Sequence, residues 1–373
     1  MRILFICGSL NPGHDGVGDY SRSLAYTFIK HGYQAEILAI NERQLARETI
    51  NFVQQEGGLN INTYRLSSLF TWKQRQELAN EIIFRYNPHF ISLQVVPFSF
   101  DSKGLPFFLP NWLRGLKKAS GAWHIMFHEL WVADSKANSF KEYIIRELQR
   151  FIIKKLLNAI GTDKVSTSNE YYKYMLKKIG YEAVLMPIFS NLPKGTLTGH
   201  PSITNRADTI VGVFFGSFLS DDRIVEKIDQ LSKTIRLQMN KKLIIFQIGK
   251  KTNEIHNFLE QSNKLENVEA SSLGFMSADA AANIMASADI GLSNYYPELI
   301  QKSGSIASML YNGLPVILLS KNVKPVDIPV PEIIQLENIG DINKFIKIDK
   351  NFDWKYSVDN AFQVMMEKFM RKF

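Results

Sequence analysis

A short polar segment late in the chain has the residue types that bind a pyrophosphate. Ser303 stands where it can cap a helix, which would leave the other first-turn N–H groups of that helix available to an anion. Lys302 adds a full positive charge, Gly304 keeps the approach open, and Ser305 lies in the same first turn. Glu298, in the loop before, is placed to accept hydrogen bonds from sugar hydroxyls. We therefore interpret this segment as a phosphate and sugar site, against the simpler alternative of an ordinary strand–loop–helix unit.

A second glycine pair follows the first apolar run. Gly16 and Gly18 can take positive φ and carry no Cβ, so backbone N–H groups can approach a phosphate or sugar where the next helix begins. With Glu42 at the end of the second apolar run, the pattern also resembles a dinucleotide-binding fingerprint. The loop from Gly8 to Gly18 is too long for the tight turn of that fingerprint, which disfavours a dehydrogenase. Asp19, Tyr20 and Arg22 lie in the first two turns of the helix that follows and are further candidate ligand contacts.

Further polar and glycine residues stand at predicted strand ends. His128 follows an apolar run, where an imidazole can donate a hydrogen bond to a substrate hydroxyl or titrate near neutrality; a structural histidine is the alternative. Its neighbour Glu129 stands at the same strand end. Glycines at two strand ends of the second half would let a nucleotide lie close to the backbone. These strand-end pairs are Gly216 with Ser217, and Gly249 with Lys250.

The candidate residues lie on a regular pattern of secondary structure. Apolar runs of strand length alternate with segments of helical period along the whole sequence. The pattern predicts an α/β fold with two doubly wound, Rossmann-like domains facing a cleft. We expect an N-terminal domain over 1–190, a hinge linker rich in Pro and Gly over 191–201, a C-terminal domain over 202–350, and a helix over 351–373 that packs back on the first domain. The predicted strands are 2–6, 35–40, 90–96, 124–128, 159–162 and 183–187 in the first half, and 209–215, 242–248, 268–271, 289–293, 315–319 and 333–336 in the second.

Composition limits the class of protein. The 373 residues are 45% hydrophobic and 12% aromatic, enough core for two domains. The single cysteine, Cys7, excludes a disulfide scaffold and fits a reducing compartment. The first apolar run breaks at Gly8, so it is typical of a strand and not of a signal peptide, and no run approaches the roughly 20 residues of a membrane-spanning helix. We expect a cytoplasmic protein.

A net charge of +8 favours anionic partners. No basic run interleaved with aromatics and no nucleic-acid module is recognisable, so we expect no nucleic-acid partner. The segment 107–118 combines apolar residues with lysines and is compatible with an anionic membrane surface at the cytoplasmic face. A helix packed on the domain core is the favoured interpretation of the same segment.

The combination of motifs resembles the GT-B glycosyltransferases, specifically the large retaining group called family four or group one. The similarity runs over nearly the whole length. In the first half it covers the glycine loop and helix at Asp15–Arg22 with His31-Gly32, and the cleft histidine pair His128-Glu129. It then covers the interdomain crossing at 187–191, the strand entry at 286–290 and the ending Asn312-Gly313-Leu314-Pro315-Val316. The family commonly carries two glutamates eight positions apart, and the corresponding positions here are Ile300 and Ser308. The basic pair usual after the first donor-domain strand is also displaced, since Ser217 follows Gly216.

The resemblance implies a sugar transfer from a nucleoside-diphosphate sugar, a UDP-sugar or GDP-sugar, to a glycan, lipid-linked or small-molecule acceptor, with retention of anomeric configuration and in polysaccharide biosynthesis. It implies no cofactor beyond the donor and no metal. Lys302, His128 and Glu298 would act at the reacting sugar, and the donor would contact the glycine and serine residues named above together with Lys250. The acceptor would contact Asp19, Tyr20, Arg22 and Glu129. Two alternatives stay open: a nucleotide-sugar epimerase of the same fold, and a catalytically silent nucleotide-sugar-binding protein.

Overall fold

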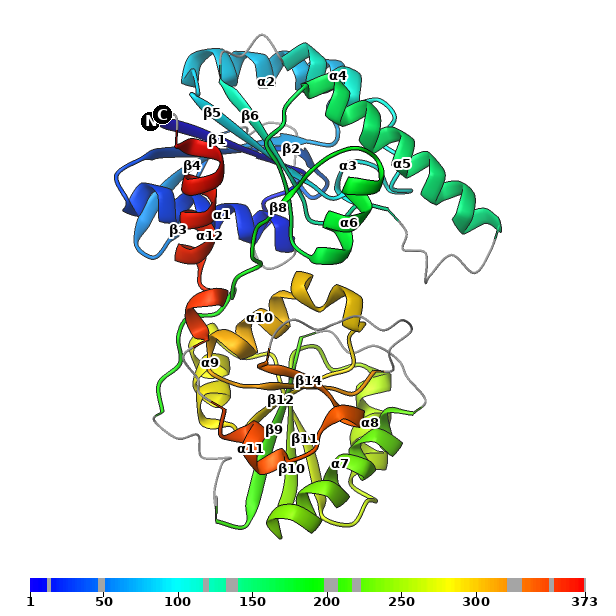
Figure 1. The fold of residues 1–373 in the computed structure, drawn as a ribbon. Helices are drawn as coiled ribbons and strands as arrows, with labels where there is room; N and C mark the ends of the chain where they lie inside the picture. The colour runs from blue at the N-terminus through cyan, green and yellow to red at the C-terminus, as the bar shows by residue number, and fades with distance from the viewer. Residues whose placement is uncertain are drawn as a thin grey trace. The chain divides into compact units, whose positions relative to one another are not determined.

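The chain forms two compact units, each built around its own sheet. The computed structural model describes residues 1–11, 15–45, 51–116, 121–131, 140–197, 207–216, 223–320, 331–348 and 352–371, with the side chains of residues 298 and 299 excepted. The first unit comprises Met1–Pro187 together with Val358–Phe373, and the second comprises Ile188–Ser357. Figure 1 shows the helices and strands of both units.

The described strands of the first unit form one eight-stranded sheet in the order β3-β4-β2-β1-β5-β6-β7-β8. All neighbouring pairs are parallel except β3 and β4. The central strands are continuous apolar runs because helices cover both faces of such a sheet. The strands are β1 (Arg2–Cys7), β2 (Gln34–Glu42), β3 (Asn51–Glu56), β4 (Leu59–Ser67), β5 (Phe90–Val95), β6 (Ala122–Phe127), β7 (Val165–Thr167) and β8 (Val184–Leu185).

Local signals in the sequence explain where the helices of this unit begin and end. Thr71 and Gln74 form a capping box at the start of one helix, and Asn87 ends it in the left-handed conformation. Asn169 caps another by accepting the N–H of Tyr172. The helices are α1 (Gly16–Lys30), α2 (Trp72–Tyr86), α3 (Pro97–Phe100), α4 (Leu109–Leu116), α5 (Phe140–Ile160), α6 (Glu170–Lys178), α12 (Val358–Met365) and the π-helix η4 (Met366–Met370).

The C-terminal helix packs on the first unit, as predicted, but it begins at Val358 and not at 351, because the segment up to Ser357 belongs to the second unit. The Phe362 ring of α12 lies edge-on to Phe28 of α1 at 4.8 Å and stacks on His31 at 4.2 Å. Lys164 donates from Nζ to the carbonyl oxygen of Phe369, 3.0 Å away. Because Phe362 and Phe369 are both buried, this helix completes the core of the unit.

The described strands of the second unit form a six-stranded parallel sheet in the order β11-β10-β9-β12-β13-β14. Its strands are β9 (Thr209–Phe215), β10 (Lys242–Ile248), β11 (Val268–Gly274), β12 (Ile290–Ser293), β13 (Val316–Leu318) and β14 (Ile333–Gln335). Its helices are α7 (Ile224–Met239), α8 (Asn253–Ser262), α9 (Ala278–Ser287), α10 (Gly304–Tyr311), α11 (Ile342–Ile346) and the 3₁₀ turns η1 (Pro297–Lys302), η2 (Leu336–Asn338) and η3 (Asp353–Tyr356).

Two apolar layers cover the faces of this second sheet. One packs α7, α8 and α11 against alternate strand residues, and the other packs α9 and α10 against the opposite face. Part of the predicted linker belongs to this unit: Gly195 donates its N–H to Asn312 Oδ1 at 2.7 Å, and Lys194 pairs with Asp353 at 2.7 Å. The rest of the predicted linker, 198–201, lies outside the described residues.

Two features of the first unit differ from the sequence prediction. The predicted strand at 159–162 is wrong, because its apolar residues are the last turn of α5, which Gly161 ends with a φ of 63°. The next strand, β7, begins only at Val165. The antiparallel pair β3–β4 was not predicted, and its turn contains Gly57 and Gly58 with φ of 52° and 82°, the positive values that a two-residue hairpin turn requires.

Within the segment 107–118, Leu109–Leu116 form a helix packed on the core, which confirms the favoured interpretation. Leu109, Trp112, Leu113 and Leu116 of α4 are buried, and Trp112 donates its indole N–H to the carbonyl of Trp72 at 2.8 Å. Residues 117 and 118 lie outside the described part. Among the helices that the structure describes, none is long and apolar enough to span a membrane.

Candidate functional site

Three neighbouring strands of the second unit end at glycines with positive φ. Gly216 follows β9 with a φ of 81°, Gly249 follows β10 with 133°, and Gly274 ends β11 with 71°. Gly216 donates its N–H to Ile248 O at 3.0 Å, and Gly249 donates to Gly274 O at 2.9 Å. The backbone thus turns sharply at the carboxyl edge of the sheet, where parallel α/β sheets bind ligands.

A pocket of about 610 Å³ lies at this edge. Three of its walls are the strand-end glycines Gly216 and Gly249, the start of α8 at Thr252 and Ile255, and the first turn of α10 at Ser305. The volume is typical of small-molecule sites. Four residues predicted as donor contacts therefore line one pocket in the structure: Gly216, Gly249, Lys250 and Ser305. The remaining strand-end residue, Ser217, lies outside the described residues.

The N-terminus of α10 has the predicted cap. Ser303 has extended backbone angles, and its hydroxyl accepts the N–H of Ile306 at 3.3 Å. Gly304 begins the helix, and a Cβ there would lie 3.5 Å from the amide nitrogen of Asn191, an ordinary contact. Lys302 is the last residue of η1, directly before the cap. Glu298 lies in the same 3₁₀ turn, but its side chain is outside the described part of the structure.

The two positions that correspond to the family's glutamates are both in the core. Ile300 is buried in the layer between α9 and α10, with 3% of its surface exposed. Ser308 is fully buried in α10, and its hydroxyl accepts a hydrogen bond from Ser190 at 3.2 Å. An acidic side chain at position 308 would bury a carboxylate beside Ser190, whose hydroxyl also donates to the carbonyl oxygen of Leu192 at 2.8 Å. Local packing therefore fits the apolar and hydroxyl residues present here.

In the first unit, the glycine loop differs from the expectation of positive φ. Gly16 and Gly18 are the first residues of α1, with helical backbone angles. Asp15 caps this helix, and its Oδ1 accepts the N–H groups of Val17 and Gly18 at 3.0 and 2.9 Å. Burial raises the pKa of Asp15. The first-turn donors predicted to meet a phosphate are thus bonded to a carboxylate of the chain itself.

Gly18 is required by the packing of its own loop. A Cβ at this position would lie 2.5 Å from the carbonyl oxygen of Ser9 and 3.1 Å from Cα of Leu10. By contrast, no atom of the described residues lies within 4 Å of a Cβ placed on Gly16. The absence of a side chain at Gly18 therefore serves the contact between α1 and the loop after β1.

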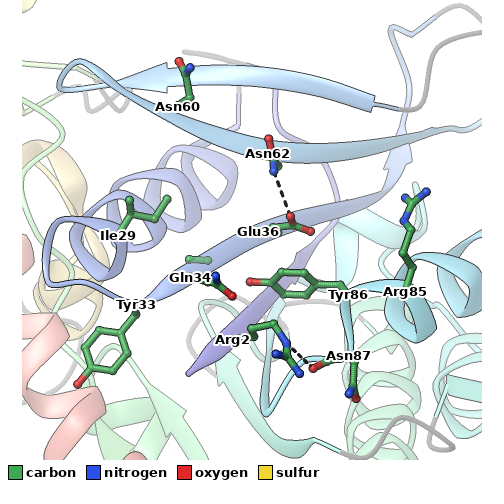
Figure 2. A pocket seen from close by; sticks show the side chains of 11 residues that line it. Arg2, Ile29, Tyr33, Gln34, Glu36, Asn60, Asn62, Arg85, Tyr86 and Asn87 are labelled. Atoms are coloured by element: carbon green, nitrogen blue, oxygen red, sulfur yellow. Dashed lines mark hydrogen bonds between the residues drawn. The ribbon is translucent and has the colours of Figure 1, made fainter.

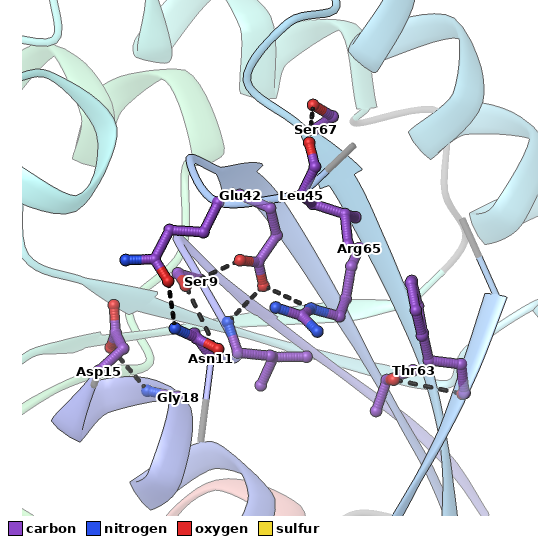
Figure 3. Close-up of polar contacts among 12 residues, drawn as sticks. Ser9, Asn11, Asp15, Gly18, Glu42, Leu45, Thr63, Arg65 and Ser67 are labelled. Carbon is purple, nitrogen blue, oxygen red and sulfur yellow. Dashed lines mark hydrogen bonds and ion pairs between the residues drawn. The ribbon is translucent and has the colours of Figure 1, made fainter. Parts of the chain in front are cut away.

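The carboxylate of Glu42 binds groups of the same loop, so it is not available to a ribose as the dinucleotide fingerprint would require. Its carboxylate accepts the N–H of Leu10 at 2.6 Å and the hydroxyl of Ser9 at 3.0 Å, and it pairs with Arg65 Nε at 2.8 Å (Figure 3). The Glu42 side chain is 1% exposed. These contacts tie the end of β2 and β4 to the loop that precedes α1.

The predicted acceptor residues on α1 pack against this loop. Arg22 is buried; its Nη1 pairs with Asp19 at 2.9 Å and its Nε donates to Gln54 Oε1 at 2.8 Å. Tyr20 is also buried, which raises the pKa of its phenol. The contacts show that Arg22 holds the hairpin strand β3 and the helix together.

His128 lies at the carboxyl end of β6, as predicted, and it contacts Tyr20. Their rings meet edge-on with centroids 4.8 Å apart. Nε2 of His128 lies 2.8 Å from Oε1 of Gln94, an acceptor, so this ring nitrogen carries the proton in the neutral imidazole. Glu129 follows and donates its N–H to Val95 O at 3.4 Å. Gln94 was not predicted, although a glutamine inside the apolar strand β5 is a visible signal.

A buried polar chain continues from Gln94 beneath this edge. Gln94 Nε2 donates to Ser92 Oγ at 2.7 Å, which lies 2.9 Å from Nδ1 of His124, whose Nε2 lies 2.8 Å from Ser166 Oγ. Burial, aided by Lys164 and His128, lowers the pKa of His124 to about 3. The neutral imidazole is therefore the form that holds β5, β6 and β7 in register.

A second pocket, of about 660 Å³, lies at the opposite, amino edge of the first sheet. It is lined by the starts of β1 and β2, by β4 and by the end of α2, and Glu36 in its wall accepts the amide of Asn62 at 3.1 Å (Figure 2). None of the residues predicted as site residues lines it. Among the described residues, no group of three or more His, Cys, Asp or Glu side chains is arranged to hold a metal ion.

Comparison with known proteins gives structural neighbours only. No family model matches the chain, and no curated protein matches it. An α,α-trehalose 6-phosphate synthase from Burkholderia multivorans superposes with a TM-score of 0.57 at 9% identity, over 100% of this chain and 96% of that one. A trehalose-6-phosphate structure from E. coli, bound with UDP-2-fluoro glucose, gives 0.54 at 8% identity, over 100% and 97%.

A candidate UDP-N-acetylglucosamine 2-epimerase from Listeria monocytogenes gives a TM-score of 0.53 at 11% identity, over 100% of this chain and 97% of that one. Likeness at such identity concerns the fold alone. Each unit of this chain has a parallel, Rossmann-like sheet, and the C-terminal helix returns to the first unit. The chain has the GT-B fold.

Proposed function

We propose that this chain is a glycosyltransferase that moves a sugar from a nucleoside-diphosphate sugar to a glycan, lipid-linked or small-molecule acceptor, with retention of configuration, as in the group one or family four enzymes. The observation that carries the proposal is the pocket of the second unit, where Gly216, Gly249 and Ser305 meet beside the N-terminus of α10. A UDP-sugar or GDP-sugar would bind there. The neighbour from E. coli supports this proposal, because it is bound with UDP-2-fluoro glucose.

The pocket suits a nucleotide because its walls differ in chemistry. Ile248, Ile255 and Phe215 offer apolar surface to a base or ribose, whereas Lys250 and Thr252 offer a cation and a hydroxyl. The strand-end glycines let a ligand lie against the backbone. A pyrophosphate would face the first turn of α10, where N–H groups and the helix dipole favour negative charge.

Catalysis would be electrostatic. The bond between the anomeric carbon and the β-phosphate oxygen breaks, the acceptor oxygen bonds to that carbon on the same face, and the acceptor proton passes to the departing phosphate. Lys302, Ser303 and the α10 N-terminus would stabilise the diphosphate as its charge increases, without a metal ion. Glu298 would position the sugar and His128 would contact it near the reacting carbon. The acceptor would bind to the first unit, at the edge where His128 and Tyr20 meet.

Two other functions are compatible with the same pocket. The Listeria neighbour favours a nucleotide-sugar epimerase, which would convert the donor without any acceptor. The buried Ile300 and Ser308 favour a silent nucleotide-sugar-binding protein, since neither position supplies a carboxylate for ribose. Incubation of the protein with UDP-sugars and GDP-sugars, with and without acceptors, separates the three by product: transferred sugar, epimerised donor or none.

The binding step is tested with two changes at one residue. Ser303→Asp keeps an N-cap acceptor but places a negative charge where the pyrophosphate would bind, so we expect wild-type stability and at least about tenfold weaker binding of UDP or GDP in calorimetry. Ser303→Ala should instead lower the free energy of unfolding by about 1 kcal/mol, with a smaller loss of binding.

Catalysis is tested by Lys302→Ala, which we expect to abolish transfer while the protein stays folded. The control is Lys344→Ala, which removes a lysine from α11 of the same unit. Wild-type nucleotide affinity in Ser303→Asp would overturn the proposed pyrophosphate position. Full transfer activity in Lys302→Ala would overturn the role of that lysine.

A further inference from the structure

The N-terminal half of α5 exposes an apolar face on the first unit. Phe140 is 80% exposed, Tyr143 50%, Ile144 42% and Phe151 49%. With 3.6 residues per turn these four side chains fall on one side of the helix, over three successive turns. Within this described helix, no residue before Gln149 is buried. In Figure 1 this end of α5 extends beyond the other helices of the unit.

Basic residues surround the apolar face. The helix carries five, Lys141, Arg146, Arg150, Lys154 and Lys155, against two glutamates. Of the two glutamates, Glu147 lies on the apolar face. Its carboxylate lies 2.9 Å from Nη1 of Arg150 and 3.3 Å from Nε of Arg146, so its charge is compensated. An exposed helix with aromatic and aliphatic residues on one side and lysine and arginine around them has the composition of a helix that lies in a membrane interface.

From this face we infer that α5 docks the protein on an anionic lipid surface, with Phe140, Tyr143, Ile144 and Phe151 entering the headgroup region and the flanking cations contacting lipid phosphates. In the basic segment 107–118, the leucines and the tryptophan of α4 are buried in the core, and only Phe107 among its described apolar residues is exposed, at 52%. The face on α5 is the exposed one. This inference does not rest on the proposed enzymatic activity.

Charge and ring contacts favour a lipid surface over two other occupants. A second copy of the chain would bring the basic residues of one α5 against those of the other, which is unfavourable. A single-stranded nucleic acid would stack its bases on free ring faces. Here Arg146 lies over the Tyr143 ring at 4.9 Å and Lys155 Nζ over the Phe151 ring at 4.8 Å, so cations already occupy a face of each ring.

The test is flotation of the full-length protein with vesicles, either phosphatidylcholine alone or equal parts of phosphatidylcholine and phosphatidylglycerol. We expect binding to the anionic vesicles, weaker binding at high salt, and little binding to phosphatidylcholine. The double variant Phe140→Ser/Phe151→Ser should bind the anionic vesicles at least about tenfold more weakly. Lys154→Gln/Lys155→Gln should also weaken binding and reduce its salt dependence.

The matched control is Phe84→Ser, which removes a phenylalanine of α2 that is 88% exposed and lies off this helix. It should bind as the wild type does. Failure of the wild type to bind anionic vesicles, or wild-type binding by the Phe140→Ser/Phe151→Ser variant, overturns the inference. So does a dimer in light scattering that this double variant converts to a monomer, or retention of a single-stranded oligonucleotide that the same variant loses. Thermal shifts with UDP, measured in parallel, report on the donor site separately.

Discussion

Gly216 and Ser305 are matched to each other across the candidate donor pocket. Gly216 follows β9 with a φ of 81°, and a Cβ at this position would overlap the hydroxyl of Ser305 in the first turn of α10. A side chain at position 216 would therefore meet two obstacles, the left-handed backbone and the serine. The relationship sets how closely the strand end approaches the N-terminus of α10.

We predict that Gly216→Ala weakens UDP or GDP binding at least about tenfold, because the new methyl group must displace Ser305 or the strand end. The strained backbone adds a loss of about 1 kcal/mol in the free energy of unfolding. Isothermal calorimetry measures the first effect and urea unfolding the second. Adding Ser305→Ala to the variant should recover part of the stability, because it removes the overlapping hydroxyl.

The control for this pair is Gly340→Ala, where a Cβ would have no atom of the described part of the chain within 4 Å. It should leave nucleotide binding unchanged. If Gly216→Ala bound UDP and GDP as the wild type does, the pocket would not be the nucleotide site. If the double variant recovered no stability, the cost would come from the backbone at Gly216 alone.

The positions of the site residues at strand ends and helix caps could be predicted from the sequence. The contacts that these residues make were harder to predict. The positions of Gly216, Gly249 and Ser303 follow from apolar runs and cap residues, which are local signals, and the structure has them at strand ends and at a helix cap. The role of Gly18 could not be predicted in this way. Its neighbours are Ser9 and Leu10, and that contact depends on how the loop after β1 folds back on α1.

Elements were misplaced where two local interpretations compete. The apolar residues at 159–162 are compatible with a short strand or with the buried face of a long helix, and tertiary packing favours the helix. The hairpin β3–β4 had a usable signal in Gly57-Gly58 between alternating residues. Gln94 is another case: its polar side chain in an apolar strand signals a buried partner, but the identity of that partner, His128, depends on strand order.

The surroundings of Glu42 lead to a prediction about stability. Its carboxylate is buried and pairs with Arg65, whose side chain is 12% exposed, while Leu10 and Ser9 donate to the same group. Glu42→Ala would leave Arg65 without this partner and the Leu10 N–H unsatisfied. We expect the free energy of unfolding to fall by about 3 kcal/mol, as for other broken buried pairs.

Chemical denaturation of Glu42→Ala beside Glu260→Ala checks this value. Glu260 pairs with Lys264 at 3.1 Å on the surface, where both side chains are more than half exposed, so its removal should cost no more than about 0.5 kcal/mol. Equal stability of the two variants would contradict a structural role for Glu42. It would also reopen the interpretation of this residue as a ligand contact.

The buried His124 predicts how stability changes with pH. Burial lowers its pKa in the folded protein to about 3, whereas the ordinary value is 6.5. Between these values the unfolded chain binds a proton that the folded chain does not, so stability is highest above pH 6.5 and falls as the pH decreases toward 3. This one residue contributes a slope of up to about 1.4 kcal/mol per pH unit in that window.

We predict that His124→Gln, which places an amide near Ser92 and Ser166, is less stable at neutral pH but has a shallower acid slope. Urea unfolding at several pH values measures both, with the exposed His256→Gln as control. An unchanged acid slope in His124→Gln would contradict this contribution and would mean that other groups, such as carboxylates whose pKa is lower in the folded protein, cause the acid sensitivity.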